Sequence, residues 1–217
     1  MIKIVITLYS FIFLLTGCSS TARYQKAEEL VNLGMTYANN GQFDSALEKY
    51  DSAIKINPEF AKAYNDRGNV YFLRGEYDLA MKEYVKAIEI DPYFAKAYSN
   101  LGFVHFEKNQ LDRAIKNYTQ AIKINPAYAK AYNNRGLVYF SSGKYDRALH
   151  DYNKAIQLDP LLAKPYDNRG LVYLQVGEIE KACADFTKAC ELGECSTFEM
   201  FQDDEFCAFT YLAMADM

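Results

Sequence analysis

From residue 27 onward, apolar side chains return at the three- and four-residue spacing of amphipathic α-helices. Short segments rich in Gly, Asn, Asp and Pro interrupt this pattern at regular intervals. A helical segment ends before Pro58 and again before Pro92, because proline disfavours helical geometry in the residue that precedes it. The pattern predicts an all-α protein built from short helices.

The helical pattern has a period of 34 residues, since prolines lie at 58, 92, 126 and 160 and Ala-Lys-Ala-Tyr begins at 61, 95 and 129. A period of this length is that of a helix-turn-helix solenoid. We number positions within each repeat from one. The expected repeats are residues 27–60, 61–94, 95–128, 129–162 and 163–193.

Two positions of the repeat always carry a small residue, which lets two helix backbones approach closely. Position 8 is Gly34, Gly68, Gly102, Gly136 and Gly170, and position 20 is Ala46, Ala80, Ala114, Ala148 and Ala182. Positions 4, 8 and 11 share one face of the first helix, opposite positions 2, 6, 9 and 13. We expect the first face to form the hairpin core, with Tyr64, Tyr98, Tyr132, Tyr166, Tyr37, Tyr71, Tyr139 and Tyr173.

The succession of aromatic, Leu, Gly, Tyr, Ala and Pro positions over residues 27–193 resembles the tetratricopeptide repeat (TPR) family. The resemblance implies a right-handed solenoid of five helix-turn-helix repeats, whose first helices line a concave groove that binds extended peptides or partner helices. Arg67, Arg135 and Arg169 depart from the family, which often has Leu there, and His105 replaces a Tyr.

The fifth repeat has Glu194 in place of its closing proline, and residues 194–217 leave the register of the repeat. We expect this segment to be a C-terminal cap, because the end of a solenoid must be covered. Its candidate covering side chains are Phe198, Phe201, Phe206, Phe209 and Leu212.

The chain begins like an export signal, with Lys3 ahead of an apolar run at residues 4–15. Twelve residues make about 18 Å of helix, short of the roughly 30 Å hydrocarbon core of a bilayer. The following Leu-Thr-Gly-Cys, residues 15–18, resembles the lipobox of bacterial lipoproteins. The resemblance implies a signal peptide at 1–17 and a fatty-acylated Cys18.

Residues 18–26 would then be a lipidated tether and the start of the first helix. By the same resemblance, Ser19 in place of Asp favours the outer membrane, with the body in the periplasm. A cell with a single membrane would display the protein outside. The alternative is an ordinary secretory leader with a chance Gly-Cys pair.

The charge balance disfavours polyanionic partners. Lys and Arg total 24 and Asp and Glu total 28, so removal of Lys3 with the leader gives 23 minus 28, or −5. A net acidic protein repels nucleic acid at long range, and we therefore expect no nucleic-acid partner.

We also expect no enzyme, no cofactor and no metal. His105 and His150 are the two histidines of the chain, and no phosphate loop, metal-spaced cluster or nucleophile elbow is present. The competing hypothesis is a hydrolase with a site in residues 194–217, which an activity screen would have to reveal.

The cysteines after Cys18 are four. Cys183 and Cys190 occupy positions that are apolar in earlier repeats, so we expect small core residues, and their spacing on one helix is too long for a mutual disulfide. Cys195 and Cys207 are the better candidates for a disulfide, which would pin the terminal cap.

The face at positions 2, 6, 9 and 13 is the expected groove lining. Asn or Asp recurs at position 6, and an Asn row can pair with the main chain of a peptide while lysines attract its carboxylates. Shared ancestry of duplicated repeats would leave the same row, so both explanations stay open. The expected groove residues are Lys62, Asn69, Phe72, Lys96, Asn100, Phe106, Lys130, Asn134, Phe140, Lys164 and Asn168.

We expect most binding energy at Asn100, Lys130 and Asn134, with Phe106 and Phe140 beside them. Some TPR domains hold a C-terminal carboxylate with two Lys, two Asn and one Arg. Here Asn69, Asn100 and Lys130 match that set, but Asn65 replaces a Lys and Asn134 the Arg.

The resulting hypothesis is a membrane-anchored scaffold or adaptor of the bacterial cell envelope, whose partners are other envelope proteins or peptides. The alternative is a pilotin-like chaperone for a secretin or pilus component. Identification of the partner would separate them.

Overall fold

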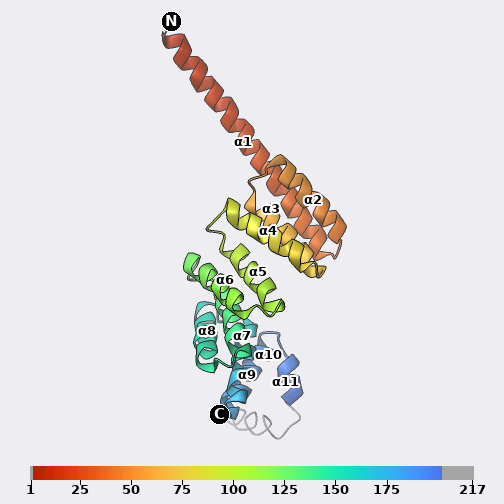
Figure 1. The fold of residues 1–217 in the computed structure, drawn as a ribbon, viewed down its shortest axis with the longest axis vertical. Coiled ribbons are helices and arrows are strands. Elements are labelled where there is room, and N and C mark those ends of the chain that lie inside the picture. Colours follow the sequence, from red (N-terminus) through yellow and green to blue (C-terminus); the bar gives the residue numbers. More distant parts are fainter. Residues whose placement is uncertain (1, 202–217) are drawn as a thin grey trace. The chain divides into compact units, whose positions relative to one another are not determined.

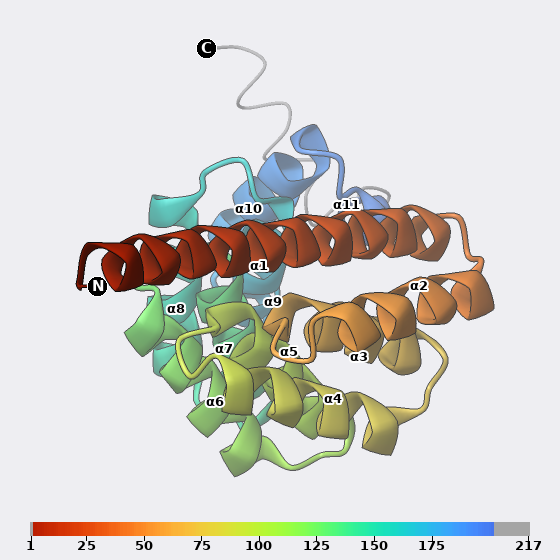
Figure 2. The same ribbon diagram turned by 90° about the horizontal axis from the view of Figure 1, so that it is seen from above.

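The computed structural model describes the backbone of residues 2–201 and the side chains of residues 21–200. Within this range the chain is helical without strands, as Figures 1 and 2 show. The helices are α1 (Ile2–Asn39), α2 (Phe43–Ile56), α3 (Ala61–Leu73), α4 (Tyr77–Ile90), α5 (Ala95–Glu107), α6 (Leu111–Ile124), α7 (Ala129–Ser141), α8 (Tyr145–Leu158), α9 (Ala163–Gln175), α10 (Ile179–Glu191) and α11 (Ser196–Phe201). The predicted all-α fold is confirmed.

Consecutive helices form hairpins, in which α1 packs on α2, α3 on α4, α7 on α8 and α9 on α10. The helices α3, α5, α7 and α9 begin at the residues where the sequence repeat restarts. Four of the hairpin turns hold a glycine with positive φ, between 69° and 81°, where a Cβ would be strained. The turn of the third repeat uses Asn109 instead, with φ 56°.

The chain divides into two compact bodies, residues 1–104 and 105–217. The N-terminal body holds α1 to α4 and most of α5, and the C-terminal body holds the end of α5 and the helices that follow it up to α11. The boundary therefore falls inside the first helix of the third repeat.

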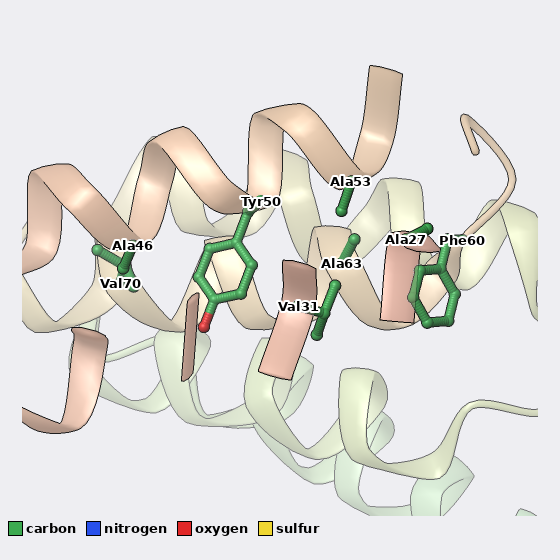
Figure 3. Close-up of a cluster of buried hydrophobic side chains, with 8 residues drawn as sticks. All are labelled: Ala27, Val31, Ala46, Tyr50, Ala53, Phe60, Ala63 and Val70. Carbon is green, nitrogen blue, oxygen red and sulfur yellow. The ribbon is translucent and has the colours of Figure 1, made fainter. Parts of the chain in front are cut away.

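The core of the N-terminal body is built around an aromatic ring of a second helix (Figure 3). Tyr50 projects from α2 among small side chains and is fully buried with Val31 and Val70. A Cβ on Gly34 would lie 2.7 Å from the Tyr50 ring, so glycine at position 8 is what makes room for it.

The same arrangement recurs along the chain. Tyr84, Tyr152 and Phe186 approach the glycines of their own repeats, where a Cβ would lie 2.5–2.7 Å from the ring. The deepest aromatic residue is thus at position 24 of the second helix. The tyrosines at position 11 of the first helix, expected in the hairpin core, are only partly buried. Position 24 fills the space that glycine leaves, and the position-11 rings pack at the edge of each cluster.

An arginine at position 7 joins the two helices in three repeats. Two of its nitrogens, Nε and Nη2, hold both oxygens of a carboxylate 16 residues further on, at 2.7–3.0 Å. The third, Nη1, donates to position 25 of the preceding repeat. We call this unit the arginine bridge. The pairs are Arg67–Glu83, Arg135–Asp151 and Arg169–Asp185, and the third partners are Asp51, Thr119 and Asn153.

The third repeat has no arginine bridge. Leu101 takes the place of the arginine, is 7% exposed and packs with Ala80, Tyr84 and Val104. Asn117 takes the place of the acid, and its amide donates to the Arg113 carbonyl on the same helix at 2.9 Å. This repeat uses apolar packing where its neighbours use charge.

Helix α1 continues without a break from Ile2 to Asn39. Residues 18–26, expected to hold the lipidated tether and the start of the first helix, are therefore part of this continuous helix. In the part of the chain that the structure describes, no helix is both long and apolar enough to span a bilayer.

The end of the fifth repeat is closed by a disulfide between Cys190 and Cys195. The expected pair of Cys195 with Cys207 is therefore wrong. A turn at Gly193, with φ 94°, reverses the chain after α10 and brings the two Cα atoms to 4.0 Å. Cys183 is buried and also disulfide-bonded.

Candidate functional site

The first helices of the N-terminal body are linked by a network of side-chain amides. Asn100 on α5 donates both N–H groups to α3, one to Asn65 Oδ1 and one to Asn69 Oδ1, each at 2.9 Å. The Tyr84 hydroxyl also donates to Asn69 Oδ1, at 2.9 Å. Buried amides that are satisfied in this way fix the spacing of α3 and α5.

A charged group lies beside this network. Asp66 accepts a hydrogen bond from Asn65 at 2.9 Å, and the Lys62 ammonium lies 3.5 Å from its other oxygen. Burial raises the pKa of the Asp66 carboxyl, and the Asn65 hydrogen bond and the charges of Lys62 and Lys96 offset only part of that rise. Lys62 is thus engaged, whereas Lys96 remains exposed at the protein surface.

The aromatic residue of the same region, Phe72, packs between two repeats. Its ring centroid lies 5.4 Å from that of Tyr77 and 5.2 Å from that of Phe103. Both rings are tilted relative to Phe72, a favourable arrangement for aromatic side chains. Phe72 is half-buried, so one side of it remains available to a ligand.

The C-terminal body repeats the amide network. Asn168 on α9 donates to Asn133 Oδ1 on α7 at 2.9 Å, and Asn133 in turn donates to Asn134 Oδ1 at 3.1 Å. In each body the two asparagines joined by this hydrogen bond are 35 residues apart in sequence, which is one repeat plus one residue.

The cations and rings of the C-terminal body differ in how they are engaged. Lys130 is exposed, whereas the Lys164 ammonium lies 2.7 Å from the Glu194 carboxylate and holds the pKa of that carboxyl below its usual value. Phe140 packs on the cluster around Tyr152, with its ring 5.9 Å from Tyr145. Phe106 is half-buried at the end of α5.

Asp167 occupies the position that Asn65 and Asn133 hold in earlier repeats. In those repeats the corresponding oxygen accepts an amide of the following first helix, but Asp167 Oδ1 is buried and accepts no hydrogen bond from a described residue. The residue is 6% exposed. The row of acceptors therefore ends on an unsatisfied carboxylate oxygen.

Among the expected groove residues, Asn100 and Asn69 are joined by a hydrogen bond, and the structure changes what two of the asparagines do. Both N–H groups of Asn100 and one N–H group of Asn168 link neighbouring first helices, so these three groups are not open donors for a peptide as expected. The exposed cations Lys96 and Lys130 and the half-buried rings Phe72 and Phe140 remain suited to contact a ligand.

Neither the hydrogen-bond partners at position 5 nor the arginine bridges were predicted from the sequence. A signal for the bridges was present in the sequence, because in three repeats Arg is followed 16 residues later by Asp or Glu. Two residues with this spacing cannot meet on a single helix, so the pattern indicates a contact between two helices. Among the described residues, no group of three or more His, Cys, Asp or Glu could hold a metal ion. His105 is buried, with Nδ1 2.7 Å from Gln110 Oε1.

Comparison with known families agrees with the repeat. A family model described as TPR repeat matches residues 34–73, 68–108 and 104–143. Two models described as tetratricopeptide repeat match residues 129–160 and 163–192. The chain belongs to the tetratricopeptide repeat family.

Solved structures with the same fold include MamA, which is 32% identical over 74% of this chain and 94% of its own, with a TM-score of 0.62. YrrB, described as a TPR protein with an unusual peptide-binding site, is 23% identical over 84% of this chain and 90% of its own, with a TM-score of 0.57. PilW, described as a type IV pilus biogenesis factor, is 20% identical over 78% and 79%, with a TM-score of 0.71. No curated protein matched the sequence.

Proposed function

We propose that this TPR protein is a lipid-anchored adaptor of the bacterial cell envelope that binds a peptide or a helix of a partner protein. The observation that carries the proposal is that the first helices of each body bear an exposed ammonium group, Lys96 or Lys130, together with a half-buried phenyl ring, Phe72 or Phe140. Cations give orientation and rings give apolar contact, which together suit a protein ligand.

The location rests on two features of the sequence and one of the structure. Residues 15–18 have the order of a lipobox, and Ser19 is compatible with the outer membrane, where the body would face the periplasm. The disulfide between Cys190 and Cys195 supports export, because such bonds persist in oxidising compartments and are rare in the cytosol.

The anchor is tested with Cys18→Ala. We expect this variant to be an unprocessed or soluble product with an unchanged helical circular dichroism spectrum. Mass spectrometry of the parent should find acyl chains on Cys18. A variant that still fractionates with membranes in the normal way would exclude the lipid anchor.

Partner binding is tested in two stages. Crosslinking in the envelope followed by mass spectrometry identifies the partner, and affinities are then measured for Lys96→Glu and Lys130→Glu. The matched control is Lys154→Glu on the second helix α8, whose ammonium donates to Gln157 at 2.9 Å. We expect each groove variant to lose about tenfold, about 1.4 kcal/mol, for an acidic or C-terminal ligand. Equal losses in the control would place the partner on another surface.

The second candidate function is assembly of a pilus or secretin component. The similarity to PilW, a pilus biogenesis factor with a TM-score of 0.71, favours this candidate. Recovery of a pilus or secretin subunit as the main crosslinked partner would select it, and recovery of other envelope proteins would select the general adaptor.

A further inference from the structure

An open cleft lies at the N-terminal end of the N-terminal body, between α1 and the loop that joins α2 to α3. Its volume is about 620 Å³, and its walls include Thr21, Arg23, Tyr24, Asn57, Pro58 and Glu59. The Tyr24 ring stands 5.1 Å from the buried Phe60 and is 48% exposed. The cleft therefore has an aromatic floor and polar walls of both charges.

The position of the cleft relative to Cys18 follows from the continuous helix α1. At 1.5 Å per residue, Thr21 lies about 4.5 Å and Tyr24 about 9 Å along the axis from Cys18. The headgroup layer on each side of a bilayer is about 5–7 Å deep. With a lipid attached to Cys18, Thr21 would lie within the depth of the headgroups and Tyr24 close to their outer edge.

We propose that this cleft docks on the bilayer surface and takes the headgroup of a zwitterionic phospholipid. The inference rests on the lipid anchor of the proposed function and adds a second membrane contact to it. Tyr24 supplies the amphipathic ring that is enriched at membrane interfaces. The cleft walls carry one guanidinium group, on Arg23, and one carboxylate, on Glu59, whose charges are opposite to those of the phosphate and the ammonium of a headgroup.

The charge of the whole protein also favours a zwitterionic surface over an anionic one. The mature chain carries about −5, so anionic lipid would repel the body while the anchor holds it near. A mixed pair of charges at the cleft gives no net attraction to an anionic bilayer. The contact should therefore not strengthen when anionic lipid is added and should depend only weakly on salt.

The chain contains no tryptophan, so a single introduced Trp reports on its own surroundings. The probes are Tyr24→Trp and Glu59→Trp in the full lipidated protein, reconstituted into phosphatidylethanolamine and phosphatidylcholine vesicles. Glu59 lies on the loop between α2 and α3, so its probe reports whether the loop side of the cleft, as well as α1, reaches the lipid. We expect both emissions to shift to shorter wavelength and to be quenched by a lipid labelled near its headgroup.

The matched control is Tyr93→Trp, which stands at the same repeat position as Glu59 in the next repeat and replaces a residue that is 80% exposed. Its emission should stay that of a solvated Trp. Equal quenching at position 93, or none at position 59, would overturn the inference. If Cys18 carries lipid in mass spectra while the probes at positions 24 and 59 stay solvated, the cleft fails and the anchor stands. If Cys18 carries no lipid, the anchor itself fails.

Discussion

The third and fourth repeats solve the same packing problem with different chemistry. In the fourth repeat, Arg135 crosses from the first helix to Asp151 on the second, at 2.8 and 2.9 Å. In the third, Leu101 and Asn117 occupy the corresponding positions. Leu101 packs in an apolar cluster, and the Asn117 amide donates to a backbone carbonyl of its own helix. The third repeat also closes its turn with Asn109 rather than glycine.

This difference coincides with the division of the molecule. The boundary between the two compact bodies, at Val104 and His105, lies in the one repeat among the second to fifth that has no arginine bridge in the described structure. A buried bidentate pair specifies one arrangement of two helices, whereas apolar contact tolerates small shifts. The comparison indicates that the arginine bridges specify the geometry of a helix pair, whereas the third repeat holds Leu101 by apolar packing.

The largest effect should come from Arg135→Leu. Asp151, whose side chain is 1% exposed, would keep a buried charge without its partner, at a cost of about 3–5 kcal/mol in the free energy of unfolding. Chemical denaturation monitored by circular dichroism measures this. The double variant Arg135→Leu with Asp151→Asn copies the third repeat and should recover most of the loss. A single variant within about 1 kcal/mol of the parent would remove the distinction between the two repeats.

Glycine substitution should affect both repeats alike, since both have glycine at position 8. A Cβ on Gly136 would lie 2.7 Å from the Tyr152 ring, so Gly136→Val should cost about 3 kcal/mol by overpacking. Gly102→Val should cost a similar amount if Tyr118 fills the same space. Thermal melting of both variants tests this, and a tolerated Gly102→Val would show that the third repeat is looser than its neighbours.

The terminal repeat differs from the internal ones by its disulfide. Cys190→Ser with Cys195→Ser opens a loop with a sequence separation of 5 and should cost about 2 kcal/mol in the chain-entropy description. The measurement is urea unfolding of the oxidised proteins. In reducing buffer the parent and the variant should unfold alike, and a difference that persists there would assign the effect to the serine side chains.

The smallest effect should come from Asp66→Asn, which gives the second repeat the amide that its neighbours carry. Burial raises the pKa of Asp66, so its ionised form destabilises the fold. The variant should gain about 1 kcal/mol at neutral pH. Because both states of the parent are protonated below pH about 4, the gain should shrink as pH falls through the raised pKa toward that value. A gain that is constant with pH would contradict this origin.

The period of 34 residues was enough to predict the helical hairpins and the residues at which α3, α5, α7 and α9 begin, because each proline and each small residue acts within one or two turns. The arginine bridges join residues 16 apart on two helices, and Asn100 reaches Asn65 on another repeat. Such pairs depend on how hairpins stack. The wrong disulfide has a similar cause, since the turn at Gly193 decides which cysteine Cys195 can meet.

The amide row shows a further limit of sequence patterns. Asn recurs at position 6, but recurrence alone does not distinguish a contact with a ligand from a contact with the preceding repeat. Only the hydrogen bonds from Asn100 and Asn168 make that distinction. The groove assignment of Lys96 and Lys130 stays a prediction.

The third nitrogen of each arginine bridge, Nη1, makes a repeat dependent on the side chain at position 25 of the repeat before it. Arg135 Nη1 reaches Thr119 and Arg169 Nη1 reaches Asn153, each in the repeat before its own. Removal of residues 95–128 would set Arg135 against Val85, which offers no acceptor, whereas removal of residues 129–162 would set Arg169 against Thr119, which does. The repeats of this protein are therefore not interchangeable, because single side chains at each junction determine which repeat can precede which.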